Sequence, residues 1–162
     1  MNNKEIAIAK HYLYPSNIFV SKEPYLVTTV LGSCISVCLF DTERKIGGIN
    51  HFMLPFWNGE GLASAKYGNI AMEKLLKEMQ LIGARKENMV AKVFGGANQA
   101  NFTMRIGERN IEIARKYLDQ FGISVVGESV DGNLGRKILF DTNTGIVKMK
   151  LIKPTQINHK LR

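Results

Sequence analysis

The sequence predicts an α+β fold built on an antiparallel or mixed sheet. Two observations favour this class: segments with strand character outnumber the helical ones, and several are joined by short polar turns typical of hairpins. A doubly wound parallel sheet would instead alternate strands and helices along the chain. With 162 residues, 45% of them hydrophobic and 22% charged, the chain has the length and composition of one globular domain, residues 1–162.

The first strand signal lies at residues 25–40, YLVTTVLGSCISVCLF, which are rich in Val, Leu, Ile and Thr. Gly32-Ser33 interrupts this run, so we expect two strands around a bend. A polar turn at 41–45 and a returning strand at 46–54, which Pro55 ends, then predict a hairpin.

Two amphipathic helices are expected, at 67–82 and 107–121. Gly83 and Gly122 follow them at the position of a C-terminal cap. Residues 56–66, between the hairpin and the first helix, contain two glycines and no periodic pattern. They predict a surface loop that could border a site.

The remaining strand signals come from the segments 89–94, 123–127, 137–140 and 145–152. The last two flank a polar turn and predict a second hairpin. Gly95-Gly96 matches neither a Walker loop nor a GxGxxG fingerprint, so we expect a turn, with a smaller chance that it lines the site. The polar, basic residues 154–162 are expected to fray.

A formal net charge of +8 is compatible with nucleic acid, an anionic membrane surface or an acidic protein partner. The positive residues are dispersed, without zinc-finger spacing, RNP-like aromatics or an arginine-rich tract, which argues against nucleic acid. Residues 1–10 contain no apolar signal-peptide core, and no stretch approaches the ~20 apolar residues that span a bilayer. We therefore expect a cytoplasmic protein that does not insert into membranes.

Cys34 is the first candidate for chemistry. It follows Gly32-Ser33, a tight bend that can leave the next backbone N–H groups free for an oxyanion. The commoner role of a free cysteine is a small buried hydrophobe, and we expect that role for Cys38. An extended strand separates the two cysteines by ~13 Å, too far for a disulfide, and free thiols fit a reducing cytoplasm.

The hairpin brings a base toward this thiol. If the turn is centred between Thr42 and Glu43, His51 lies opposite Cys34 on the same face. A shift of one residue would move His51 to the other face, and a purely structural histidine remains the alternative. The imidazole also needs an orienting acceptor. Thr28 or Thr29 could supply it, and strand alternation puts Thr28 on the parity of Cys34.

Other site types have weaker support. The histidines His11, His51 and His159 are scattered without zinc-like spacing, so neither a metal nor a cofactor is expected. Trp57 and Phe102 lie in predicted loops, where an aromatic side chain can anchor a partner. Packing of these rings back onto the core is at least as common.

Several motifs resemble one family over residues 25–152. They are LGSC at 31–34, NHFMLP at 50–55, KYG at 66–68, GGA at 95–97, IGERN at 106–110, and Gly132-Asn133 with Arg136. In their order and type they are similar to CheD, the chemoreceptor glutamine deamidases of bacterial chemotaxis. The LGSC and NHFMLP motifs are the most specific of the set, whereas residues 57–61 match no clear family pattern.

The resemblance implies a cysteine hydrolase whose catalytic residues map to Cys34, His51 and Thr28, with no cofactor. The fold would be similar to that of the necrotizing-factor deamidase toxins, a β-sandwich with helices outside. The implied substrates are glutamines of methyl-accepting chemotaxis receptors, and the implied partner is a CheC-type phosphatase. Two other functions stay open: a regulatory binding module for that phosphatase, and a cysteine hydrolase with another substrate.

Overall fold

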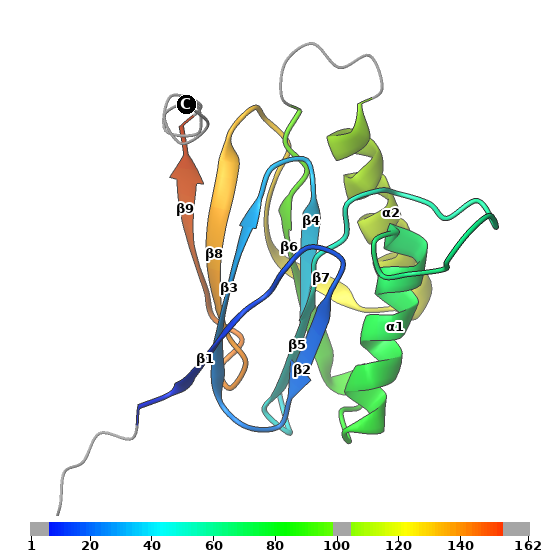
Figure 1. Ribbon diagram of the computed structural model, residues 1–162. Coiled ribbons are helices and arrows are strands. Elements are labelled where there is room, and N and C mark those ends of the chain that lie inside the picture. The colour runs from blue at the N-terminus through cyan, green and yellow to red at the C-terminus, as the bar shows by residue number, and fades with distance from the viewer. Residues whose placement is uncertain (1–6, 99–104, 154–162) are drawn as a thin grey trace, which may run out of the picture.

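The computed structural model describes residues 7–98 and 105–153, which form three layers (Figure 1). Sheet A has four strands in the order β1-β3-β8-β9, and sheet B has five in the order β2-β5-β4-β6-β7. The sheets face one another, and the helices α1 and α2 cover the outer face of sheet B. Both sheets are mixed, because β1 runs parallel to β3 and β6 parallel to β7. The predicted α+β class, with a sheet sandwich flanked by helices, is confirmed.

The elements in chain order are β1 (Ala9–Tyr12), β2 (Ile18–Ser21), β3 (Tyr25–Leu31), β4 (Ile35–Asp41), β5 (Ile46–Asn50), α1 (Gly68–Leu81), a 3₁₀ turn (Lys86–Asn88), β6 (Met89–Gly95), α2 (Ile106–Phe121), β7 (Ser124–Val130), β8 (Gly135–Asp141) and β9 (Val147–Ile152). Both predicted helices and both predicted hairpins are confirmed. β1 and β2 were not predicted, because each has only four residues and becomes a strand by pairing with distant β3 and β5.

Two clusters of buried side chains hold the layers together. One lies between sheet B and the helices, and the other lies between the two sheets. Alternation along β4 divides its side chains between them, so that Val37 faces the helices while Cys38 faces sheet A. In the described ranges 7–98 and 105–153, neither helix is long and apolar enough to cross a membrane.

The Gly32-Ser33 bend carries the chain from one sheet to the other. β3, before the bend, belongs to sheet A, whereas β4, after it, belongs to sheet B. Cys34 therefore lies where the chain crosses over, at one end of the space between the sheets.

The hairpin of β4 and β5 has a different register from the one predicted. Asp41 lies opposite Ile46 across a four-residue turn at 42–45, so opposite residues sum to 87 rather than 85. The prediction that Cys34 lies directly opposite His51 is therefore wrong by two residues. Side chains alternate with a period of two, so this shift keeps both residues on the predicted face.

The Asp41 side chain builds this turn. It is fully buried, and its carboxylate accepts the backbone N–H groups of Glu43, Arg44 and Arg85 at 2.8–3.0 Å. Burial raises the pKa of this carboxyl, but the hydrogen bonds that favour the charged form outweigh it, so the pKa lies below the usual range.

We expect Asp41→Ala to lower the free energy of unfolding by about 2–3 kcal/mol, because buried N–H donors lose a charged acceptor. Urea unfolding at pH 7 measures this. The native carboxylate has the lower pKa, so its contribution is present at neutral pH and is lost as the pH falls below about 4. Asp119→Ala on the exposed face of α2 is the control, with an expected change within about 0.5 kcal/mol. Equal effects of the two variants would contradict the prediction.

Candidate active site

Hydrogen bonds fix the bend that contains Cys34. The carbonyl oxygens of residues 32–34 accept, in order, from the Ala97 N–H at 3.0 Å, the Asn110 side-chain amide at 2.9 Å and the Gly96 N–H at 2.9 Å. With these carbonyls held, the peptide planes of the bend have a defined orientation. The thiol of Cys34 is itself partly exposed at the end of the inter-sheet cluster.

Within the part of the chain that the structure describes, the backbone N–H groups of Ser33 and Cys34 have no carbonyl or side-chain oxygen as partner. The Cys34 N–H favours the thiolate form of its own side chain and so lowers the pKa of this thiol in part. Neighbouring N–H groups that no backbone carbonyl occupies are what an oxyanion site requires. The role of Gly32 and Ser33 in such a site stays a prediction.

Gly95 and Gly96 do more than turn the chain. Both have positive φ, +110° and +70°, which glycine adopts without strain. A Cβ at Gly95 would collide with the carbonyl oxygen of Cys34, and one at Gly96 would collide with Ile111. The turn thus packs directly against the Cys34 bend, a contact that the glycine pair alone could not have revealed.

His51 lies on the same inter-sheet face as Cys34. The isolated bridge between Ile35 and Phe52 continues the hairpin register past the regular ladder. That register puts Ser36 opposite His51 and makes Cys34 the diagonal neighbour. Diagonal neighbours lie roughly 7–8 Å apart, within reach of long and aromatic side chains. The crossover and the hairpin therefore bring the thiol and the imidazole to the same end of the sandwich.

The protonation of His51 follows from its hydrogen bonds. The Thr29 hydroxyl donates its single proton to the Leu13 carbonyl at 2.7 Å, and its oxygen lies 2.7 Å from His51 Nδ1. Both contacts are hydrogen bonds only if Nδ1 carries the proton and donates to Thr29. Nε2 then has a free lone pair, and among the described residues it has no hydrogen-bond partner. Burial lowers the pKa of His51 to about 4, so the ring is neutral at pH 7.

The threonine that contacts His51 in this structure is Thr29 rather than Thr28, and a catalytic role for Thr28 stays a prediction. Thr28 is partly exposed opposite Leu139 and points to the face of sheet A turned away from sheet B, whereas Thr29 is fully buried against His51. The parity argument failed because it counted strand alternation through the bend to Cys34. Since β3 and β4 belong to different sheets, alternation does not carry across.

The thiol is protonated in the resting site. Burial raises the pKa of Cys34, and the hydrogen bond from its own backbone N–H offsets this only in part. A neutral thiol and a neutral imidazole at the same end of the sandwich are compatible with general-base activation of the thiol, and not with a standing thiolate–imidazolium pair.

We expect the rate at which iodoacetamide alkylates Cys34 to rise with pH, with a midpoint above that of an ordinary thiol. Mass spectrometry of a Cys38→Ala background isolates the signal of Cys34. Fast alkylation that stays constant between about pH 5 and 8 would instead indicate a thiolate stabilised by an imidazolium.

Of the two aromatic residues predicted to anchor a partner, the structure describes Trp57. Trp57 is partly exposed in the loop before α1, and its indole N–H donates to the Glu60 carbonyl at 2.9 Å. Its backbone N–H donates to Asn69 Oδ1, also at 2.9 Å. Phe102 lies outside the described residues. Partner binding by either side chain stays a prediction.

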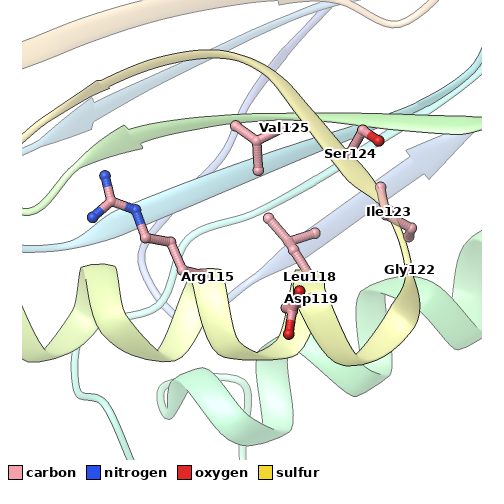
Figure 2. A pocket seen from close by; sticks show the side chains of 7 residues that line it. All are labelled: Arg115, Leu118, Asp119, Gly122, Ile123, Ser124 and Val125. Atoms are coloured by element: carbon pink, nitrogen blue, oxygen red, sulfur yellow. The ribbon is translucent and has the colours of Figure 1, made fainter.

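A pocket of about 500 Å³ lies apart from this site (Figure 2). Figure 2 shows Leu118 of α2 and Val125 of β7 facing one another across it. Its β7 residues pair with the start of β6, whereas the end of β6 packs against the Cys34 bend. The lining, which consists of Arg115, Leu118, Asp119, Gly122, Ile123, Ser124 and Val125, contains neither thiol nor imidazole.

A partly exposed thiol, free backbone donors and a histidine with one nitrogen fixed and the other open are typical of cysteine-dependent hydrolases. Comparison with known proteins gives the family. The family model described as CheD chemotactic sensory transduction matches residues 53–151. This chain belongs to the CheD family, which confirms the resemblance found in its sequence.

Curated relatives carry the name probable chemoreceptor glutamine deamidase CheD. The protein from Trichlorobacter lovleyi is 54% identical over 86% of this chain and 89% of its own length. The protein from Sulfurimonas denitrificans is 45% identical over 91% of this chain and 97% of its own length. The protein from Vibrio vulnificus is 40% identical over 91% of this chain and 74% of its own length.

Proposed function

We propose that this chain acts in the cytoplasm and hydrolyses the side-chain carboxamide of glutamines in chemoreceptors, with Cys34 as nucleophile and His51 as general base. The names of its relatives support the reaction and the substrate class. One observation supports the mechanism above all others. The proton on His51 Nδ1 is held by Thr29, which leaves Nε2 as an acceptor on the face shared with Cys34.

The first half of the reaction is acyl transfer. His51 Nε2 takes the thiol proton as Cys34 Sγ attacks the carboxamide carbon, and the backbone N–H groups of Ser33 and Cys34 donate to the oxyanion. The imidazolium returns that proton to the departing nitrogen. Ammonia leaves, and a thioester remains on Cys34.

Hydrolysis of the thioester completes the cycle. His51 takes a proton from water, the hydroxide attacks the thioester carbon, and the Cys34 sulfur leaves and is reprotonated by the imidazolium. The product is a glutamate side chain. A hydroxyl at Nδ1 suits both halves, because it stabilises the imidazolium that forms in each.

Incubation with a receptor cytoplasmic fragment in ¹⁸O-labelled water tests this function. We expect peptide mass spectrometry to find glutamate with a single ¹⁸O at the converted glutamines, and an enzymatic assay to find an equal amount of ammonia. Ammonia release with an added primary amine incorporated in place of oxygen would make the chain a transglutaminase instead. No ammonia with several receptor fragments would refute the proposal.

We also propose that a CheC-type phosphatase binds this chain and competes with the receptor. The family resemblance supports this partner. Addition of the phosphatase should raise the apparent KM for the receptor fragment and leave kcat unchanged. Binding of the phosphatase by a chain that deamidates nothing would favour the regulatory module instead.

A further inference from the structure

Asn110 of α2 lies beside the candidate site, and its side-chain hydrogen bonds go to neither the thiol nor the imidazole. It is fully buried, on the stripe of the helix that faces sheet B. Its side-chain nitrogen donates to the carbonyls of Ser33 at 2.9 Å and Met53 at 3.0 Å. Carbonyls can only accept, so the orientation of the amide is fixed by its partners.

These carbonyls belong to the two segments that the chemistry needs. The hairpin ladder makes its last pair of hydrogen bonds between Ile35 and Phe52. Beyond that pair, the amide of Asn110 connects the bend before the nucleophile to the segment just after His51. The Asn110 side chain thus holds the two segments together where the backbone hydrogen bonds of the hairpin end.

The contact with Ser33 also sets the direction of a donor. In a trans peptide the C=O and the following N–H point in opposite directions. Because the Ser33 carbonyl is bound by Asn110 of α2, the Cys34 N–H points away from the helix, toward the inter-sheet cluster against which Cys34 packs.

We infer that Asn110 is a positioning residue that aims the Cys34 N–H at the oxyanion of the reaction, an inference that rests on the proposed function. Its Oδ1 supports this role, since it has no hydrogen-bond partner within residues 7–98 and 105–153. A buried acceptor without a partner costs about 1–3 kcal/mol. The two hydrogen bonds of the Asn110 nitrogen contribute about 0.5–1.5 kcal/mol each, so this cost offsets much of what the side chain adds to stability.

Asn110→Leu keeps the branched shape of the side chain but removes the donor, and Asn110→Ala removes both. We expect kcat for the receptor fragment to fall roughly 10²-fold in each variant, the effect of losing one oxyanion donor, while KM stays within about 2-fold. Alkylation of Cys34 by iodoacetamide forms no oxyanion. Its rate and pH profile should therefore match those of the wild type.

Leu118→Ala is the matched control, because it destabilises the same helix from a fully packed apolar position. At a temperature where all variants are folded, its kcat should stay within about 2-fold of wild type. Unchanged kcat in both Asn110 variants, or an equal loss of turnover and alkylation, would overturn the inference. Deamidation of the receptor fragment by the wild type tests the proposed function by itself. A failure of that function can therefore be distinguished from a failure of the inference about Asn110.

Discussion

Cys34→Ala is expected to release no ammonia from a receptor fragment above the uncatalysed background. The variant lacks the only atom proposed to attack the carboxamide, and loss of a covalent nucleophile costs on the order of 10⁴-fold or more in kcat. Binding should persist, because the substitution removes one partly exposed sulfur atom. Single-turnover mass spectrometry, combined with a binding measurement on the same fragment, gives both quantities.

Cys38→Ala is the matched control. Cys38 of β4 packs in the same inter-sheet cluster as Cys34 but is almost fully buried, and burial raises its pKa far above that of an ordinary thiol. We expect a loss of about 1 kcal/mol in stability and full deamidation activity. Activity that survives in Cys34→Ala and disappears in Cys38→Ala would reverse the assignment of the nucleophile.

Thr29→Val should lower kcat by roughly 10–100-fold, because His51 loses the acceptor that keeps its proton on Nδ1. Once the proton moves to Nε2, no lone pair faces Cys34. The variant also leaves the Leu13 carbonyl without its donor, so the free energy of unfolding should fall by about 1–3 kcal/mol. Steady-state kinetics below the unfolding transition separates the catalytic effect from the loss of stability.

Thr28→Val distinguishes the structure from the family-based assignment. Thr28 is the neighbour that the resemblance maps to the catalytic position, but its side chain points to the other face of sheet A. The geometry predicts kcat within about 2-fold of wild type for this variant. A large loss in Thr28→Val together with normal activity in Thr29→Val would show that Thr29 is not the residue that orients His51.

Local patterns were sufficient for most of the secondary structure. The period of the apolar residues placed α1 and α2 to within about one residue, and glycines marked their ends. The hairpin of β4 and β5 was also evident, although its register was not. Asp41 closes a four-residue turn where a tighter one was assumed, and this choice depends on a carboxylate that also binds Arg85, far along the chain.

Contacts between distant segments decided the other parts of the site. The polar Asn110 on an otherwise apolar helix stripe was a signal that could have been noticed, but its partners Ser33 and Met53 lie 77 and 57 residues away. Similarly, the glycines Gly95 and Gly96 have a recognisable turn signature, while their contact with Cys34 depends on how β6 packs against β4.

The sequence by itself determined the fold class, the Gly-Ser bend before a free cysteine, the histidine on the returning strand and the family. Each of these follows from the spacing of nearby residues or from a motif, and both can be recognised within a single stretch of chain. Only the tertiary structure decided that the bend crosses between two sheets and that Thr29 rather than Thr28 meets His51. Side-chain alternation holds within a strand but not across a change of sheet, so the third residue of the site depended on packing.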